Sequence, residues 1–110
     1  MFETTLERRR YPRQHLRGRV FLQVLDKDIH ESEVLDISWS GLGLLDVVEI
    51  AGLNWVQANR YKHLPVTICF NDRDLTAWGT LVRVNPRRNS ASIRITRTSD
   101  DEAWRSLCSE

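Results

Sequence analysis

The sequence contains few of the residues that support covalent or metal chemistry. Of its 110 residues, two are cysteine, Cys69 and Cys108, and three are histidine. The cysteines form no CxxC motif and the histidines show no HxH or HExxH spacing, so neither a disulfide framework nor a metal site is predicted. The sequence also lacks a P-loop, a GxGxxG loop and a GxSxG elbow. We therefore expect no metal, no cofactor and no catalytic residues, and the protein is not expected to be an enzyme.

Long apolar runs are also missing. No stretch approaches the roughly 20 apolar residues that a membrane helix needs. Residues 1–7 carry two glutamates and show no apolar core of the signal-peptide type. These absences predict a cytoplasmic protein without a membrane span, and its length suits one domain with a modest core.

Lysine is scarce, because fourteen of the sixteen basic residues are arginine. Arginine is suited to bidentate, planar recognition of phosphate and guanine. The charges are unevenly spread: residues 1–19 hold six arginines and two glutamates, a net +4, whereas residues 20–60 hold two basic and seven acidic side chains, a net −5. The basic start indicates an anionic partner, but the overall charge of +1 argues against charge-driven coating of nucleic acid.

Six segments have the features of short β-strands. They alternate polar and apolar residues or are rich in β-branched residues, and turn-forming residues separate them. The predicted strands span residues 20–25, 29–37, 41–45, 65–70, 75–84 and 90–96. This pattern predicts a mainly all-β fold, an antiparallel barrel or sandwich whose closure removes exposed strand edges.

A short C-terminal helix is predicted after the last strand. Ser99 and Glu102 have the spacing of a capping box, with Ser99 as the N-cap. Trp104 and Leu107 then share one helical face. A helix over 99–108 is too short to be stable alone, so we expect it to dock on the barrel through Trp104.

The connection over residues 48–63 is long for a hairpin. We expect a turn or two of helix within residues 53–61. Trp55 and Tyr61 are expected to pack this connection onto the barrel. If they are exposed instead, they mark a surface for a protein partner.

An arginine cluster precedes the first predicted strand. It consists of Arg8, Arg9, Arg10 and Arg13, and Pro12 disfavours a helix there, so the segment is predicted to be a loop. A flexible arginine-rich arm can close over a ligand that carries several negative charges and become ordered on binding. The same composition is also typical of a solvated basic tail.

A second polar cluster, Asp36, Ser38 and Gly41, lies after the second predicted strand. Asp36 and Ser38 are two apart and so share one face of an extended chain. Gly41 allows either a positive φ or a close backbone approach to a ligand. A carboxylate can accept from the N1–H and N2–H₂ groups of guanine, and arginine pairs with O6 and N7. Taken alone, these residues are also common in plain β-turns.

The two clusters together read RxxxR (Arg9, Arg13) followed by DxSxxG (Asp36, Ser38, Gly41). This pattern resembles the PilZ domain, the bacterial receptor module for cyclic di-GMP. The resemblance covers most of the chain and implies a six-stranded antiparallel β-barrel with a C-terminal helix. We therefore expect a single domain over 1–110, with a mobile arginine-rich arm at 1–16, the barrel at 17–97 and the helix at 99–108.

The resemblance also implies roles for the motif residues. By this resemblance, Arg9 and Arg13 would hold phosphate and guanine edges, and Arg8 and Arg10 extend the same cluster. The three residues of the second motif would surround a guanine; they are Asp36, Ser38 and Gly41.

Trp78 is a further candidate, within the predicted strand 75–84. An exposed aromatic on a barrel wall can stack on a purine. Packing within the barrel or on its surface is the alternative role for Trp78. Trp39 occupies a variable position of the second motif and receives no ligand role.

The sequence thus predicts a stand-alone cyclic di-GMP receptor that orders its N-terminal arm on binding and signals to a protein partner. Two alternatives remain. A small β-barrel that binds single-stranded nucleic acid would use its arginines and Trp78, although the absence of basic residues between Lys27 and Arg60 disfavours nucleic acid. A PilZ-like scaffold that works without ligand would not need the intact motifs.

Overall fold

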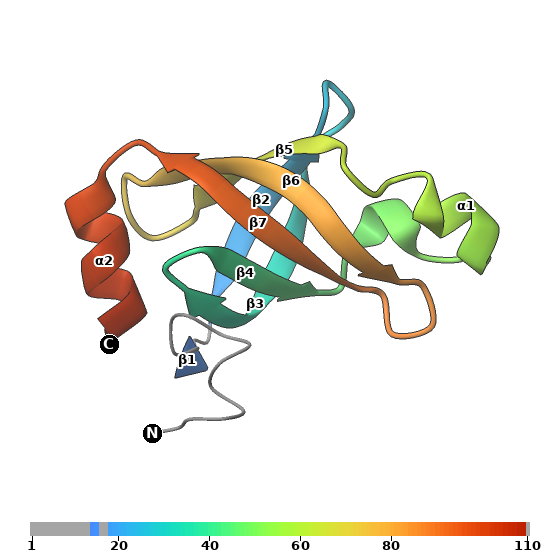
Figure 1. The fold of residues 1–110 in the computed structure, drawn as a ribbon, viewed down its shortest axis with the longest axis horizontal. Coiled ribbons are helices and arrows are strands. Elements are labelled where there is room, and N and C mark those ends of the chain that lie inside the picture. The colour runs from blue at the N-terminus through green and yellow to red at the C-terminus, as the bar shows by residue number, and fades with distance from the viewer. Residues whose placement is uncertain (1–13, 16–17, 110) are drawn as a thin grey trace.

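The computed structural model describes the backbone of residues 14–15, and both backbone and side chains of residues 18–109. The main strands are β2 (Arg19–Val24), β3 (His30–Ser38), β4 (Gly41–Leu45), β5 (Pro65–Phe70), β6 (Thr76–Asn85) and β7 (Ser90–Thr98). They pair in the order β3-β2-β5-β6-β7-β4, and β4 pairs again with β3 (Figure 1). The described residues thus form a closed six-stranded antiparallel barrel, which confirms the predicted fold.

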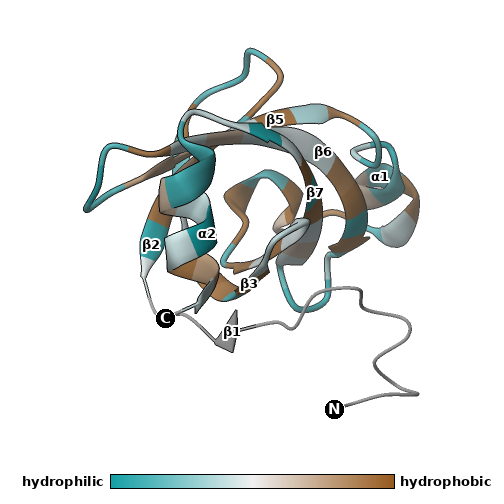
Figure 2. Ribbon diagram, turned by 60° about the vertical axis from the view of Figure 1, so that its left-hand side comes forward, coloured by the Kyte–Doolittle hydropathy of each residue, from teal (hydrophilic) through white to brown (hydrophobic). Residues whose placement is uncertain are grey.

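Alternation along the strands builds the core. In β5 and in most of β6, every second residue is buried, as expected for strands with one face inside a barrel. Paired strands bring their inward residues together in rows, one of which is Ile37, Leu42, Ile93 and Leu81, each at most 1% exposed. Figure 2, with α2 (Asp101–Ser109) turned forward, shows the strands encircling this interior. The side chains between the inward positions therefore form an outer wall.

The helix α2 begins one residue later than its predicted cap implies. The Asp100 carboxylate oxygen Oδ1 accepts two backbone N–H groups of the first turn, at 3.1 Å each, so Asp100 is the N-cap and the prediction of Ser99 was wrong. The Ser99 hydroxyl instead accepts the backbone N–H of Thr76 at 2.9 Å. Ser99 has the spacing of a cap, but its hydroxyl accepts a hydrogen bond from β6 instead of from the first turn of α2.

Trp104 anchors α2 to the barrel, as predicted. Its side chain is 1% exposed, and its indole Nε1–H donates to the backbone carbonyl of Trp39 at 3.0 Å. Its ring meets Phe70 edge-on, with centroids 6.0 Å apart and an interplanar angle of 76°. Because Trp39 lies in the turn between β3 and β4, this contact ties α2 to that end of the barrel.

The long connection between β4 and β5 holds a 3₁₀ turn, η2 (Val48–Ile50), and a short helix, α1 (Trp55–Asn59). Asn54 caps α1 through a capping box, which confirms the expected helical segment. Tyr61 is partly buried and packs against the core, whereas Trp55 is 48% exposed. The expectation for Tyr61 is confirmed, and Trp55 takes the exposed alternative. Over the part of the chain that is described, no helix is long and apolar enough to cross a membrane.

Candidate functional site

The residues of the DxSxxG motif lie where β3 turns into β4. Asp36 and Ser38 flank Ile37, which is fully buried in the core, so both point to the outer wall. Ser38 is the last residue of β3 and is paired with Gly41, the first residue of β4. Ser38 is only 3% exposed. The structure thus brings Asp36, Ser38 and Gly41 together at the end of the barrel that carries α2.

A β-bulge sets the direction of Asp36. The register between β3 and β4 shifts between Val34 and Asp36, which leaves Leu35 as the extra residue. Before the bulge, the buried positions of β3 are Ser32 and Val34; after it, they are Ile37, which faces the core, and Ser38 at the end of the strand. Without the extra residue, Asp36 would continue the inward series. The bulge therefore places the carboxylate on the outer wall, where a ligand can reach it.

Gly41 does not have the backbone conformation considered for it. It is buried within β4, and the glycines with positive φ in the described residues are Gly18 and Gly52. The positive-φ explanation was wrong, because the chain reverses before Gly41 rather than at it. Close backbone approach is the explanation that remains for this glycine.

Gly43 is a site residue that the sequence interpretation missed. It is paired with Asp36, and a Cβ built on Gly43 would lie 2.8 Å from the Asp36 oxygen Oδ1. Glycine at this position therefore leaves room for the carboxylate to rest against the backbone of β4. The available signal was the spacing of Gly41 and Gly43, since residues two apart on a strand share one face.

The short strand β1 runs beside Asp36. The backbone of β1 (Gln14–His15) pairs with β3, with Gln14 opposite Ile37 and His15 opposite Asp36. The predicted arginine cluster, Arg8, Arg9, Arg10 and Arg13, lies outside the described residues. In the sequence, Arg13 is bonded directly to Gln14, the first residue of β1.

Two further arginines lie on the same outer wall. One row of paired outward residues runs through Ser38, Gly41, Arg94 and Thr80. The next row runs through Asp36, Gly43, Ser92 and Arg83. Because neighbouring strands are about 4.8 Å apart, Arg94 lies roughly 10 Å from Ser38 between backbones. Arg94 was also missed; its signal was an outward position beside the inward Ile93.

Trp78 lies on the outer wall but not beside the motif. It is paired with Arg97, whose guanidinium carbon lies 4.0 Å from the centroid of the indole ring. Such a cation–π contact is worth about 0.5–1 kcal/mol at an exposed site. Strands β7 and β4 separate β6 from β3, so the structure does not place Trp78 against Asp36 or Ser38.

In the described residues, the site consists of an acid, a hydroxyl and two guanidinium groups on a curved wall. Within the described residues, no group of three or more histidine, cysteine or acidic side chains is arranged to hold a metal ion. A carboxylate near a hydroxyl offers acceptors to N–H groups, while arginines offer paired donors to phosphate. The arrangement is therefore suited to binding a polar anion that also carries N–H donors.

Comparison with known proteins identifies the fold. The sequence matches no family model and no curated protein sequence. The structure is similar to that of the Bacillus subtilis inhibitor of motility, MotI/DgrA, with a TM-score of 0.62 and 16% sequence identity. The match covers 91% of this chain but 49% of that one, so this chain spans about half the length of the similar protein. At this identity the likeness shows the fold alone, and that fold is PilZ-like.

Proposed function

We propose that this protein is a receptor for cyclic di-GMP, which binds on the outer wall formed by β3, β4 and β7. The observation that carries the proposal is the bulge at Leu35, which turns Asp36 outward beside Ser38. A carboxylate in this position can accept the N1–H and N2–H₂ donors of one guanine edge. The PilZ-like fold supports the same function.

The N-terminal arginines would complete the site. The backbone of β1 pairs with β3 at Asp36 and Ile37. Arg13 directly precedes Gln14 in the sequence, and Arg9 is one RxxxR spacing earlier. We propose that Arg8, Arg9, Arg10 and Arg13 close over the phosphates and the second guanine. A ligand that binds only the closed arm shifts the population towards it.

The wall offers further contacts to a ligand of this size. Arg94 follows Gly41 in the row that begins at Ser38, and can donate to a phosphate. Trp78 can stack on a base, but Arg97 already covers one face of its indole. A base would therefore use the other face or displace the guanidinium, at a cost of about 0.5–1 kcal/mol.

We further propose that the protein acts in the cytoplasm as a binding module and not as an enzyme, and that it transmits the signal to a protein partner. The similar solved protein is described as an inhibitor of motility, which supports a regulatory role for this fold. In this view the closed arm alters the surface that a partner meets.

Calorimetric titration of cyclic di-GMP into the whole chain tests the proposal. Asp36→Asn replaces an acceptor oxygen with a donor, and a lost charge-assisted hydrogen bond costs about 1.5–3 kcal/mol. We expect affinity to fall by roughly tenfold to a hundredfold. Asp46→Asn is the matched control, because it removes the same charge from an exposed residue outside the motif, whose φ of 56° asparagine tolerates.

Further arms separate the alternatives. Arg13→Ala should also abolish or strongly weaken binding, and GTP should not compete. Absence of binding by the folded protein would contradict the receptor function and favour a ligand-free scaffold. Equal binding by the wild type and Asp36→Asn, or displacement by a short oligonucleotide with a steep salt dependence, would favour the nucleic-acid barrel.

A further inference from the structure

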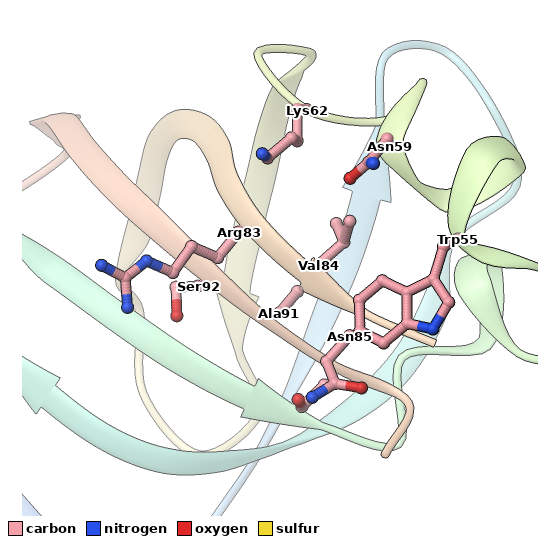
Figure 3. Close-up of a pocket in the computed structure, with 9 residues that line it drawn as sticks. Trp55, Asn59, Lys62, Arg83, Val84, Asn85, Ala91 and Ser92 are labelled. Carbon is pink, nitrogen blue, oxygen red and sulfur yellow. The ribbon is translucent and has the colours of Figure 1, made fainter. Parts of the chain in front are cut away.

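A second concave surface lies at the end of the barrel that carries α1. It is a hollow of about 490 Å³ between α1, the residues that follow it, and the hairpin of β6 and β7. Figure 3 shows Trp55 projecting from α1 over Asn85, with Asn59 and Lys62 above and Arg83 and Ser92 on the strands. Arg83 and Ser92 also end the outer-wall row that begins at Asp36, whereas Trp55, Asn59 and Lys62 lie outside that row and outside the motifs of the proposed cyclic di-GMP site.

One wall of the hollow is an exposed tryptophan held in place by local structure. The Asn54 carboxamide oxygen accepts the Gln57 N–H at 2.8 Å, and the Gln57 side chain accepts the Asn54 N–H at 3.0 Å. This reciprocal cap fixes the start of α1 and therefore the position of Trp55. Trp55 is 48% exposed, Val56 beside it 68%, and Val48 of η2 49%. Three exposed apolar side chains thus belong to the connection that borders the hollow.

The charge around the hollow is mainly positive. Lys62 and Arg83 line the hollow, and Arg60, Arg87 and Arg88 are exposed on the same connection and hairpin. The acidic residues of these segments are Asp46 and Glu49. The Glu49 side chain is 4% exposed and lies 3.2 Å from the His30 Nδ1, so the exposed acid of these segments is Asp46, against five exposed cations. An acidic partner is therefore favoured.

We propose that this hollow docks an acidic segment of a partner protein. An apolar side chain of the segment packs on Trp55, and its carboxylates pair with Lys62 and Arg83. Tryptophan and arginine are the residues that most often dominate protein interfaces. A nucleic acid would pair with the cations but leave Val48 and Val56 uncovered, so the apolar margin favours a protein. The proposal is independent of cyclic di-GMP binding and goes beyond it.

Selection from a phage library of random dodecapeptides tests the proposal with no nucleotide present. The whole chain is the target and its Lys62→Glu variant the counter-target. We expect enriched peptides to combine aspartate or glutamate with a large apolar residue. Titrated into ¹⁵N-labelled protein, they should shift the indole N–H resonance of Trp55. Their affinity should fall at least tenfold in Lys62→Glu and in Trp55→Ala.

Lys27→Glu is the matched control, because Lys27 is exposed in the turn between β2 and β3 and does not line the hollow. It makes the same charge change and should leave peptide affinity unaltered. Both variants change exposed residues, and their amide spectra verify the fold. The proposal is overturned if no peptide is enriched over the counter-target, if the peptides lack acidic residues, if Lys27→Glu weakens binding as much as Lys62→Glu, or if an oligo(dT) shifts Trp55 more strongly than the peptides do.

Discussion

The two ends of the barrel hold their exposed chemistry in different ways. At the α2 end, Asp36 and Ser38 are part of the strand register, and the turn between β3 and β4 is fixed by a hydrogen bond from Trp104. At the α1 end, Trp55 projects from a five-residue helix that depends on its own cap. At the α2 end, the site residues are therefore coupled to the core. At the α1 end, Trp55 can be substituted with little effect on the core. Substitutions at the two ends should therefore separate stability from binding.

The largest difference is expected between two tryptophans. Trp104→Ala removes a buried ring that contacts Phe70 and Trp39, and should lower the free energy of unfolding by about 3–5 kcal/mol. Trp55→Ala removes a half-exposed ring and should change the free energy of unfolding by about 0.5 kcal/mol or less. Urea denaturation of both variants measures the contrast. Equal losses would show that α1 is coupled to the core as tightly as α2.

A pair of glycines tests the same contrast on a smaller scale. Gly43→Ala places a methyl group 2.8 Å from the Asp36 carboxylate, which is flexible enough to move. Stability should change by less than about 1 kcal/mol, whereas affinity for cyclic di-GMP should fall about tenfold, or about 1.4 kcal/mol. Calorimetry and urea denaturation give the two values.

Gly52→Ala is the counterpart at the other end. Its φ of +79° disfavours alanine by about 1–2 kcal/mol, although no atom lies within 4 Å of the added Cβ. This variant should lose stability and retain nucleotide affinity. If Gly43→Ala retained full affinity for cyclic di-GMP, the Asp36 carboxylate would not be the guanine contact.

The smallest effect concerns the two free cysteines. Burial raises the pKa of the Cys108 thiol on α2 to about 11, whereas Cys69 on β5 is exposed. The thiolate is the reactive form, so at pH 8 iodoacetamide should label the exposed Cys69 much faster than Cys108. The raised pKa means that the folded protein favours the neutral Cys108 thiol over the thiolate. The stabilisation that this preference gives the fold is lost as pH rises from about 9 to about 11. Peptide mass mapping reads both sites, and equal rates would mean that α2 is not docked in solution.

The fold could largely be predicted from the sequence, because alternation reports burial directly. The segments 41–45 and 65–70 match β4 and β5, and the other strands differ by one or two residues at their ends. The N-cap of α2 could not be chosen correctly, because Ser99 and Asp100 both suit a cap. Only the tertiary bond from Thr76 to Ser99 decides between them.

The site could be predicted only where a motif exists. Asp36, Ser38 and Gly41 were found together, but the bulge at Leu35 that turns Asp36 outward leaves no clear mark in the sequence. The proximity of Arg94 depends on pairing across β4, and the hollow beside Trp55 depends on a connection with no repeating pattern. Such features arise from strand register and tertiary packing, which local sequence does not encode.

The most direct test uses the indole N–H resonances of the four tryptophans in ¹⁵N-labelled protein. The central claim is that cyclic di-GMP binds at Asp36 on the outer wall. Titration with cyclic di-GMP should therefore shift Trp39 and Trp78, change the backbone resonances of residues 1–13, and leave Trp55 unmoved. In Asp36→Asn the same shifts should require a roughly tenfold to hundredfold higher ligand concentration. A shift of Trp55 without Trp78, or the same titration midpoint in the variant as in the wild type, would contradict the claim.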